Sequence, residues 1–192
     1  MYDQITAIQE QARGATEDGS YVYADSLYSL AGELLGPQPH SLDEQMLRAQ
    51  ILGEHGRTKA LLAYAVQGND TARLLCDARD YITDAAAIVG RFQGEYNLGS
   101  IHMTDQELRA LHTASGTFHR YLGCVATTAL SMECPIGVDA ADQYEWAHDE
   151  LLQGKSGEQL VVNALAATHH ERLFGTSAGE KRWSIRSVHA AT

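Results

Sequence analysis

Histidine and acidic side chains are the groups in this sequence that could bind a metal ion. Nine histidines occur among 192 residues. His112 and His119 are seven residues apart, so on a helix they would share one side but lie two turns apart, too far to bind one ion without a third ligand between them. Glu145 and His148 have the Glu-x-x-His spacing of di-iron bundles, but the chain holds no second copy of it. The sequence therefore predicts no metal site and no cofactor.

Three aspartates in one predicted helix could also hold a divalent ion against a phosphorylated substrate. Asp77, Asp80 and Asp84 fall on one helix side, and Arg73 and Arg79 lie close to them. Residues three and four apart on a helix are neighbours, so these arginines can pair with the carboxylates. The pattern favours a solvated face with ion pairs.

A metal-dependent nucleotide hydrolase is the third hypothesis for this chain. His148-Asp149 resembles the histidine-aspartate pair of metal phosphohydrolases, but no aspartate follows Asp149. No serine or cysteine has the base or oxyanion context of a nucleophile. Gly154-Lys155-Ser156 lacks the upstream glycine and the strand of a phosphate loop, which predicts a simple turn. A chain without catalysis is therefore the leading expectation.

Helical elements carry all of these side chains. The sequence has only three prolines and long runs of Ala, Leu, Gln, Glu and Arg, a balance typical of an all-α protein. Ser41 and Thr104 each precede a glutamate by three residues, the capping-box spacing that begins a helix. Apolar residues then recur at steps of three and four. Helices are predicted over residues 3–16, 21–35, 42–52, 58–66, 71–89, 104–132, 140–153 and 158–174, in one domain of residues 1–174.

Two glycine-containing stretches are predicted to interrupt this pattern. Gly53 and Gly56 weaken the helix that begins after Ser41, so a second helix is expected from Thr58. Residues 90–103 hold three glycines and are expected to form a loop. Its aromatic residues dock on the body or, alternatively, line a pocket for a small molecule, in which case the pocket residues are Phe92, Tyr96 and His112.

The stretch from Gly19 to Ala31 resembles the second half of a tetratricopeptide repeat. A Gly-x-Tyr turn is followed by small and aromatic residues at the spacing of that family, and a proline ends the unit. Residues 4–37 carry the match, and later units reproduce it poorly. The resemblance implies antiparallel helical hairpins in a right-handed stack. A closed helical bundle is the alternative, because small-aromatic alternation also packs ordinary bundles.

If the resemblance holds, the first helix of each pair lines a concave face that binds a peptide or protein. Carried over position by position, that face includes Thr6, Gln9, Arg13, Asp43, Met46 and Gln50. The predicted function is thus a non-catalytic interaction scaffold. A helical small-molecule-binding regulatory domain is the alternative.

Charge and cysteine content limit the partners. The formal net charge of -11 disfavours nucleic acid and favours a basic peptide or protein. An odd number of cysteines without a leader sequence predicts a cytoplasmic protein, and no apolar run is long enough for a membrane span. Residues 175–192 form a basic tail, whose Trp183 could dock on the acidic body or on a second copy of the chain.

Overall fold

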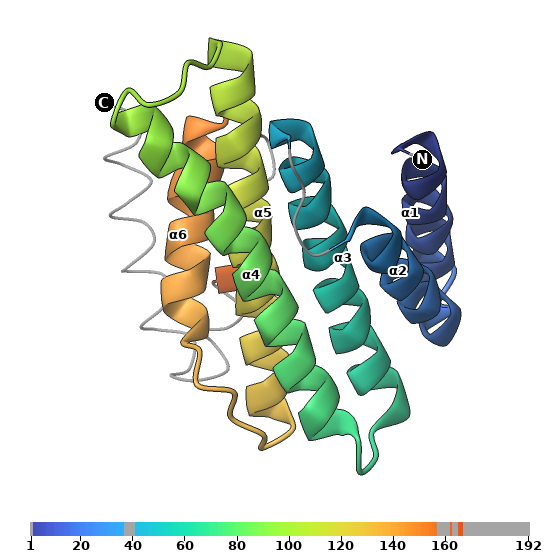
Figure 1. Ribbon diagram of the computed structural model, residues 1–192. Helices are drawn as coiled ribbons and strands as arrows, with labels where there is room; N and C mark the ends of the chain where they lie inside the picture. The colour runs from blue at the N-terminus through green and yellow to red at the C-terminus, as the bar shows by residue number, and fades with distance from the viewer. Residues whose placement is uncertain (1, 37–40, 157–161, 163–164, 167–192) are drawn as a thin grey trace.

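The computed structural model describes residues 2–36, 41–156, 162 and 165–166, and this part of the chain is all-α (Figure 1). Its helices are α1 (Tyr2–Glu17), α2 (Tyr21–Leu35), α3 (Leu42–Val66), α4 (Thr71–Asn97), α5 (Asp105–Ser131) and α6 (Ala140–Gln153). None of these helices is long and apolar enough to cross a membrane. The predicted tail, including Trp183, and most of the predicted last helix lie outside the described residues.

Short connections pair the helices into hairpins. Gly19 turns the chain between α1 and α2 with a φ of 78°, which glycine adopts without steric cost. The predicted capping boxes are both present, because the Ser41 and Thr104 hydroxyls accept from the amides of Glu44 and Glu107. The starts of α3 and α5 are therefore fixed by residues next to them in the sequence.

The hairpins follow one another in an open order. Consecutive helices pack together, and α3 also contacts α1 and α5. Among the described helices, the backbones of α1 and α2 approach only each other and α3, so they lie at one end of the molecule (Figure 1). This arrangement of neighbouring hairpins confirms the predicted all-α fold with antiparallel helix pairs.

Two apolar clusters share α3. The larger one contains residues of α3, α4, α5 and α6, and the smaller one joins α1 and α2 to Leu47 and Ile51 of α3. The predicted stripe of α4 is fully buried: Leu75, Ala78, Ile82, Ala85 and Val89. Val162 and Ala166 also lie in the larger cluster. The first hairpin therefore has its own small core and is fastened to the rest through α3.

The predicted break in α3 is wrong. One helix runs from Leu42 to Val66, and Gly53 and Gly56 lie buried within it. Phe118 of α5 packs where a side chain of Gly53 would be, and Ile82 of α4 packs where one of Gly56 would be. These glycines serve close helix approach, and the packing outweighs their low helix propensity.

The predicted loop over residues 90–103 is also largely wrong. Helix α4 continues to Asn97, because Phe92 is part of the core at 5% exposure and holds the last turns against the body. Gly99, whose φ is 71°, follows the C-cap residue Leu98. The amides of Gly99 and Ser100 donate to the carbonyls of Tyr96 and Glu95, which is a Schellman motif.

Candidate functional site

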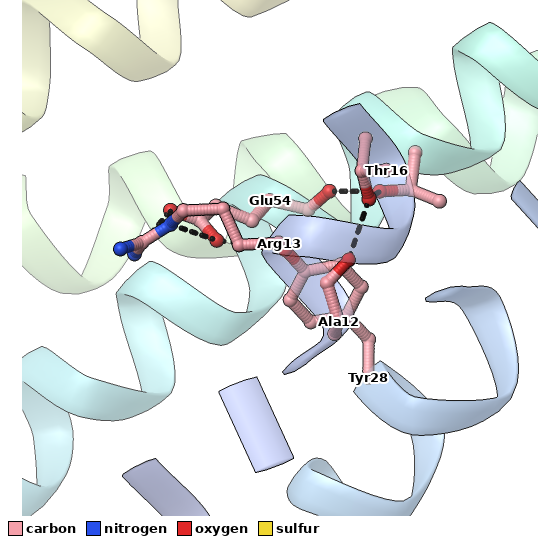
Figure 2. Close-up of polar contacts among 6 residues, drawn as sticks. Ala12, Arg13, Thr16, Tyr28 and Glu54 are labelled. Atoms are coloured by element: carbon pink, nitrogen blue, oxygen red, sulfur yellow. Dashed lines mark hydrogen bonds and ion pairs between the residues drawn. The ribbon is translucent and has the colours of Figure 1, made fainter. Parts of the chain in front are cut away.

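A polar junction fastens the first hairpin to α3 (Figure 2). Glu54 of α3 accepts two kinds of donor: Arg13 of α1 donates from Nη2 at 2.8 Å, and the Tyr28 hydroxyl of α2 donates at 2.8 Å. Behind this pair the Thr16 and Thr58 hydroxyls lie 2.9 Å apart, and both residues are buried. One carboxylate thus links three helices.

A second carboxylate, Asp25 of α2, binds two buried donors of α3. Its Oδ1 lies 2.7 Å from His55 Nε2 and 2.8 Å from Lys59 Nζ. Since a carboxylate oxygen can only accept, His55 Nε2 carries a proton here. The side chains of His55 and Lys59 are only 4% and 11% exposed, against 27% for Asp25. Asp25 therefore neutralises a lysine that is almost withdrawn from water.

Aromatic rings enclose this group. The His55 ring stacks on Tyr81 of α4 with centroids 4.5 Å apart and on Tyr28 at 5.8 Å. Lys59 Nζ lies 5.7 Å from the centroid of the Tyr81 ring, within cation–π range. His55, Tyr28 and Tyr81 also line a cavity of about 430 Å³ between α2, α3 and α4. The junction thus lies beside this cavity.

The electrostatics of the junction follow from burial and from pairing. Burial lowers the pKa of His55 from 6.5, and the Asp25 hydrogen bond and charge only partly offset that effect. Burial would raise the pKa of Asp25, but the hydrogen bonds from Lys59 and His55 lower it below 3.8. The pKa of the Tyr28 hydroxyl is raised by burial and by Glu54. At neutral pH Asp25 is thus ionised and His55 is neutral.

Acidification is expected to destabilise the fold through His55. Because the folded-state pKa lies below 6.5, the unfolded chain binds a proton that the folded chain does not, so the free energy of unfolding falls as pH drops below about 6.5. One such site changes stability by at most about 1.4 kcal/mol per pH unit. Asp25 stays ionised in this range, and Asp77 contributes a weaker attraction. Urea unfolding between pH 7.5 and 5.5 measures the effect.

The matched variant is His55→Gln, whose amide can donate to Asp25 but does not titrate. It is expected to show a shallower loss of stability with falling pH than the original chain. Equal pH dependence in the two proteins would contradict this assignment to His55.

A groove between α3 and α5 brings together two arginines and a tyrosine. It measures about 360 Å³ and is lined by Arg57, Leu61, Arg120, Tyr121, Cys124, Val125 and Leu165. The guanidinium carbon of Arg57 lies 5.8 Å from the centroid of the Tyr121 ring, and that of Arg120 lies 5.3 Å from it. Burial raises the pKa of the Cys124 thiol, and the hydrogen bond from Tyr144 and the charges of Arg120 and Arg57 offset that rise only in part. The groove is locally cationic in an acidic protein.

The six residues predicted for a binding face divide between the surface and the interior. Gln9 is buried at 3% exposure, and its Nε2 has no hydrogen-bond partner among the described residues. Arg13 is engaged by Glu54, and Thr6 and Met46 are half-buried. Asp43 and Gln50 are exposed. Five of the six predicted residues therefore lie at least partly exposed on α1 and α3, whereas Gln9 is buried in the interior.

The alternative pocket residues are not all in one place either. Phe92 is sealed in the core and Tyr96 is half-buried near the end of α4. His112 lies on α5, where its Nδ1 is 3.0 Å from Glu150 Oε2 of α6. Gln93 Nε2 donates to the same oxygen at 2.7 Å. A hollow of about 390 Å³ beside this cluster is lined by Gln93, Glu150, His119 and Trp146, among others.

Among the described residues, no three His, Cys, Asp or Glu side chains meet in a group that could hold a metal ion. Two of the three predicted aspartates form surface ion pairs: Arg73 pairs with Asp77, and Arg79 pairs with Asp80. Arg73 also pairs with Asp70, just before α4.

Comparison of the chain with protein-family models, with curated proteins and with solved structures found no match. The geometry alone therefore defines the class of protein: an all-α chain of helical hairpins with a cationic groove on one face.

Proposed function

We propose that this protein is a non-catalytic scaffold that binds a peptide or protein segment on the face formed by α1, α3 and α5. The observation that carries the proposal is the groove whose lining comes from α3 and α5 together with Leu165, since α3 and α5 are the first helices of their hairpins. Contacts of α3 with both α1 and α5 support a stacked, repeat-like order.

One stripe of α3 links the predicted face to the groove. Gln50, Glu54, Arg57 and Leu61 follow one another at steps of four, three and four, so they share one side of the helix. Glu54 holds Arg13 of α1, and Arg57 and Leu61 line the groove. A polar rim around apolar and aromatic residues is the usual composition of a protein interface. Arginine and tyrosine are also the residue types that dominate binding energy.

A peptide-library selection tests the proposal. Peptides selected against the folded chain are expected to lose at least about tenfold in affinity on Leu61→Glu, because the charge and bulk fill the groove. Leu98→Glu is the matched control, since Leu98 is 83% exposed after the end of α4. Circular dichroism verifies that both variants remain folded. Failure to select any peptide, or equal affinities for both variants, would refute the scaffold.

The hollow between α4, α5 and α6 favours a second candidate function, the binding of a small polar molecule. Gln93, His112 and Glu150 form a half-buried hydrogen-bonded cluster at its edge, and the His119 ring meets Trp146 edge-on at 4.9 Å. Small-molecule sites commonly combine such aromatic walls with a few convergent polar groups.

A further inference from the structure

We propose that the α3–α5 groove binds the carboxylate side chains of an acidic peptide segment. The inference rests on the scaffold function proposed above and specifies the chemistry of its partner. The partner would thus differ from the basic one that the net charge of -11 suggests.

The charges inside the groove favour an anion. Its seven lining residues include two arginines and no acidic side chain. The guanidinium carbons of Arg57 and Arg120 lie 5.8 Å and 5.3 Å from the centroid of the same Tyr121 ring. A carboxylate that reached Arg57 in the groove would gain charge-assisted hydrogen bonds, which are stronger than neutral ones.

Arg57 is the residue of the groove best placed to bind a carboxylate. Four other arginines, Arg13, Arg73, Arg79 and Arg91, pair with carboxylates, and Arg48 and Arg109 donate to backbone carbonyl oxygens. Arg57 is half-buried, but it makes no ion pair with any residue that the structure describes. Its guanidinium carbon lies 5.8 Å from the centroid of the Tyr121 ring, a cation–π contact that favours this position, and its N–H groups can still bind a carboxylate. A fixed cation of this kind loses little entropy on binding.

The remaining lining residues fit the stems of acidic side chains. Leu61, Val125 and Leu165 supply aliphatic walls beside the arginines. The methylene groups of glutamate can lie against these walls while its carboxylate reaches the guanidinium groups. The groove thus suits a short segment that carries glutamate or aspartate among small residues.

The acidic body does not outweigh this local preference at physiological salt. The Debye length is about 8 Å at 0.15 M ionic strength, so exposed charges farther away act weakly on a ligand in the groove. The charge of Arg57 inside the groove then favours an anionic ligand.

Three fluorescein-labelled peptides of equal length test the inference. They carry Glu, Gln or Lys at alternate positions with Ala between them, and fluorescence anisotropy is measured at 150 mM salt. The glutamate peptide is expected to bind at least about tenfold more tightly than the other two. Arg57→Ala should remove most of that preference, and Arg57→Lys should retain part of it. Arg73→Ala, on α4 and outside the groove lining, should leave it unchanged.

Equal binding of the glutamate and glutamine peptides, a preference for lysine, or full binding by Arg57→Ala would overturn the inference. Library-selected peptides that depend on Leu61 but lack acidic residues would overturn it as well and leave the scaffold function standing. If the unmodified chain bound no peptide at all, both the acidic-peptide inference and the scaffold function would be overturned. Thermal melts establish that each variant is folded, and Arg57→Gln replaces the alanine variant if that protein unfolds.

Discussion

Replacement of Asp25 by alanine is expected to lower the free energy of unfolding by about 3 kcal/mol. The substitution removes the only carboxylate that the structure places on Lys59 and His55 within its described residues. Lys59 would lose its carboxylate partner in a site where its side chain is 11% exposed, and His55 would lose its partner at Nε2. The figure is the lower end of the range for such a deletion, because Asp25 itself retains 27% exposure.

A second substitution separates the cost of leaving Lys59 without a carboxylate partner from the other effects of removing the Asp25 side chain. Asp25→Ala combined with Lys59→Met removes the cation but keeps its apolar stem, so it should recover about 2 kcal/mol over Asp25→Ala alone. The remaining deficit of about 1 kcal/mol reflects His55 without an acceptor. Urea unfolding measures all three proteins. Asp80→Ala is the control, since it breaks an exposed pair with Arg79 and should cost less than about 1 kcal/mol.

Equal losses for Asp25→Ala and Asp80→Ala would show that the junction contributes no more than a surface ion pair. If the double variant were less stable than Asp25→Ala, the buried charge of Lys59 would not be the source of the cost.

Sequence alone predicts the features of this fold that depend on neighbouring residues. The capping boxes at Ser41 and Thr104 act within one turn, and both are present. The stripe of α5 from Leu111 to Ala129 is a periodic pattern read from one helix, and it is buried. The bounds predicted for α6 agree with the structure because Asp139 caps it and Gly154 follows it.

The features that the sequence does not predict are those that depend on packing against a second helix. Gly53 and Gly56 predict a break by propensity, but the close approach of α4 and α5 keeps α3 continuous. Burial of Phe92 likewise extends α4 past Gly90 and Gly94. Helix propensity differs by about 1 kcal/mol per glycine, which is less than the burial of one large side chain contributes.

The polar junction and the groove also depend on contacts between helices, which the sequence does not predict. Asp25 lies 30 residues from His55, so their contact depends on how α2 packs on α3. The predicted binding face, carried over from the repeat pattern, does not include Arg57, and the predicted break around Gly53 and Gly56 separates Arg57 from Gln50. Because α3 is continuous, the spacing of four and then three residues from Gln50 through Glu54 to Arg57 places Arg57 on the same side of the helix as Gln50. That spacing was the one indication in the sequence that could have located the groove.

Replacement of Gly56 by valine is the second substitution expected to have a large effect. A β-carbon at this position would lie 2.5 Å from Ile82 Cγ1 and 2.7 Å from the Ala78 carbonyl oxygen, so α4 would have to move away from α3. Overpacking of a buried contact of this kind costs about 1–3 kcal/mol, and two branches beyond the β-carbon place this case near 3 kcal/mol. Urea unfolding would measure the loss.

Gly90→Val provides the matched control because it makes the same chemical change in a helix. Gly90 is exposed in α4, and a β-carbon there would meet nothing within 4 Å. The control should change stability by no more than about 0.5 kcal/mol. If both variants were equally stable, the continuity of α3 would not depend on close packing against α4. A large loss at Gly56 alone would instead show that this glycine, predicted to break the helix, is the residue that lets α3 and α4 share one core.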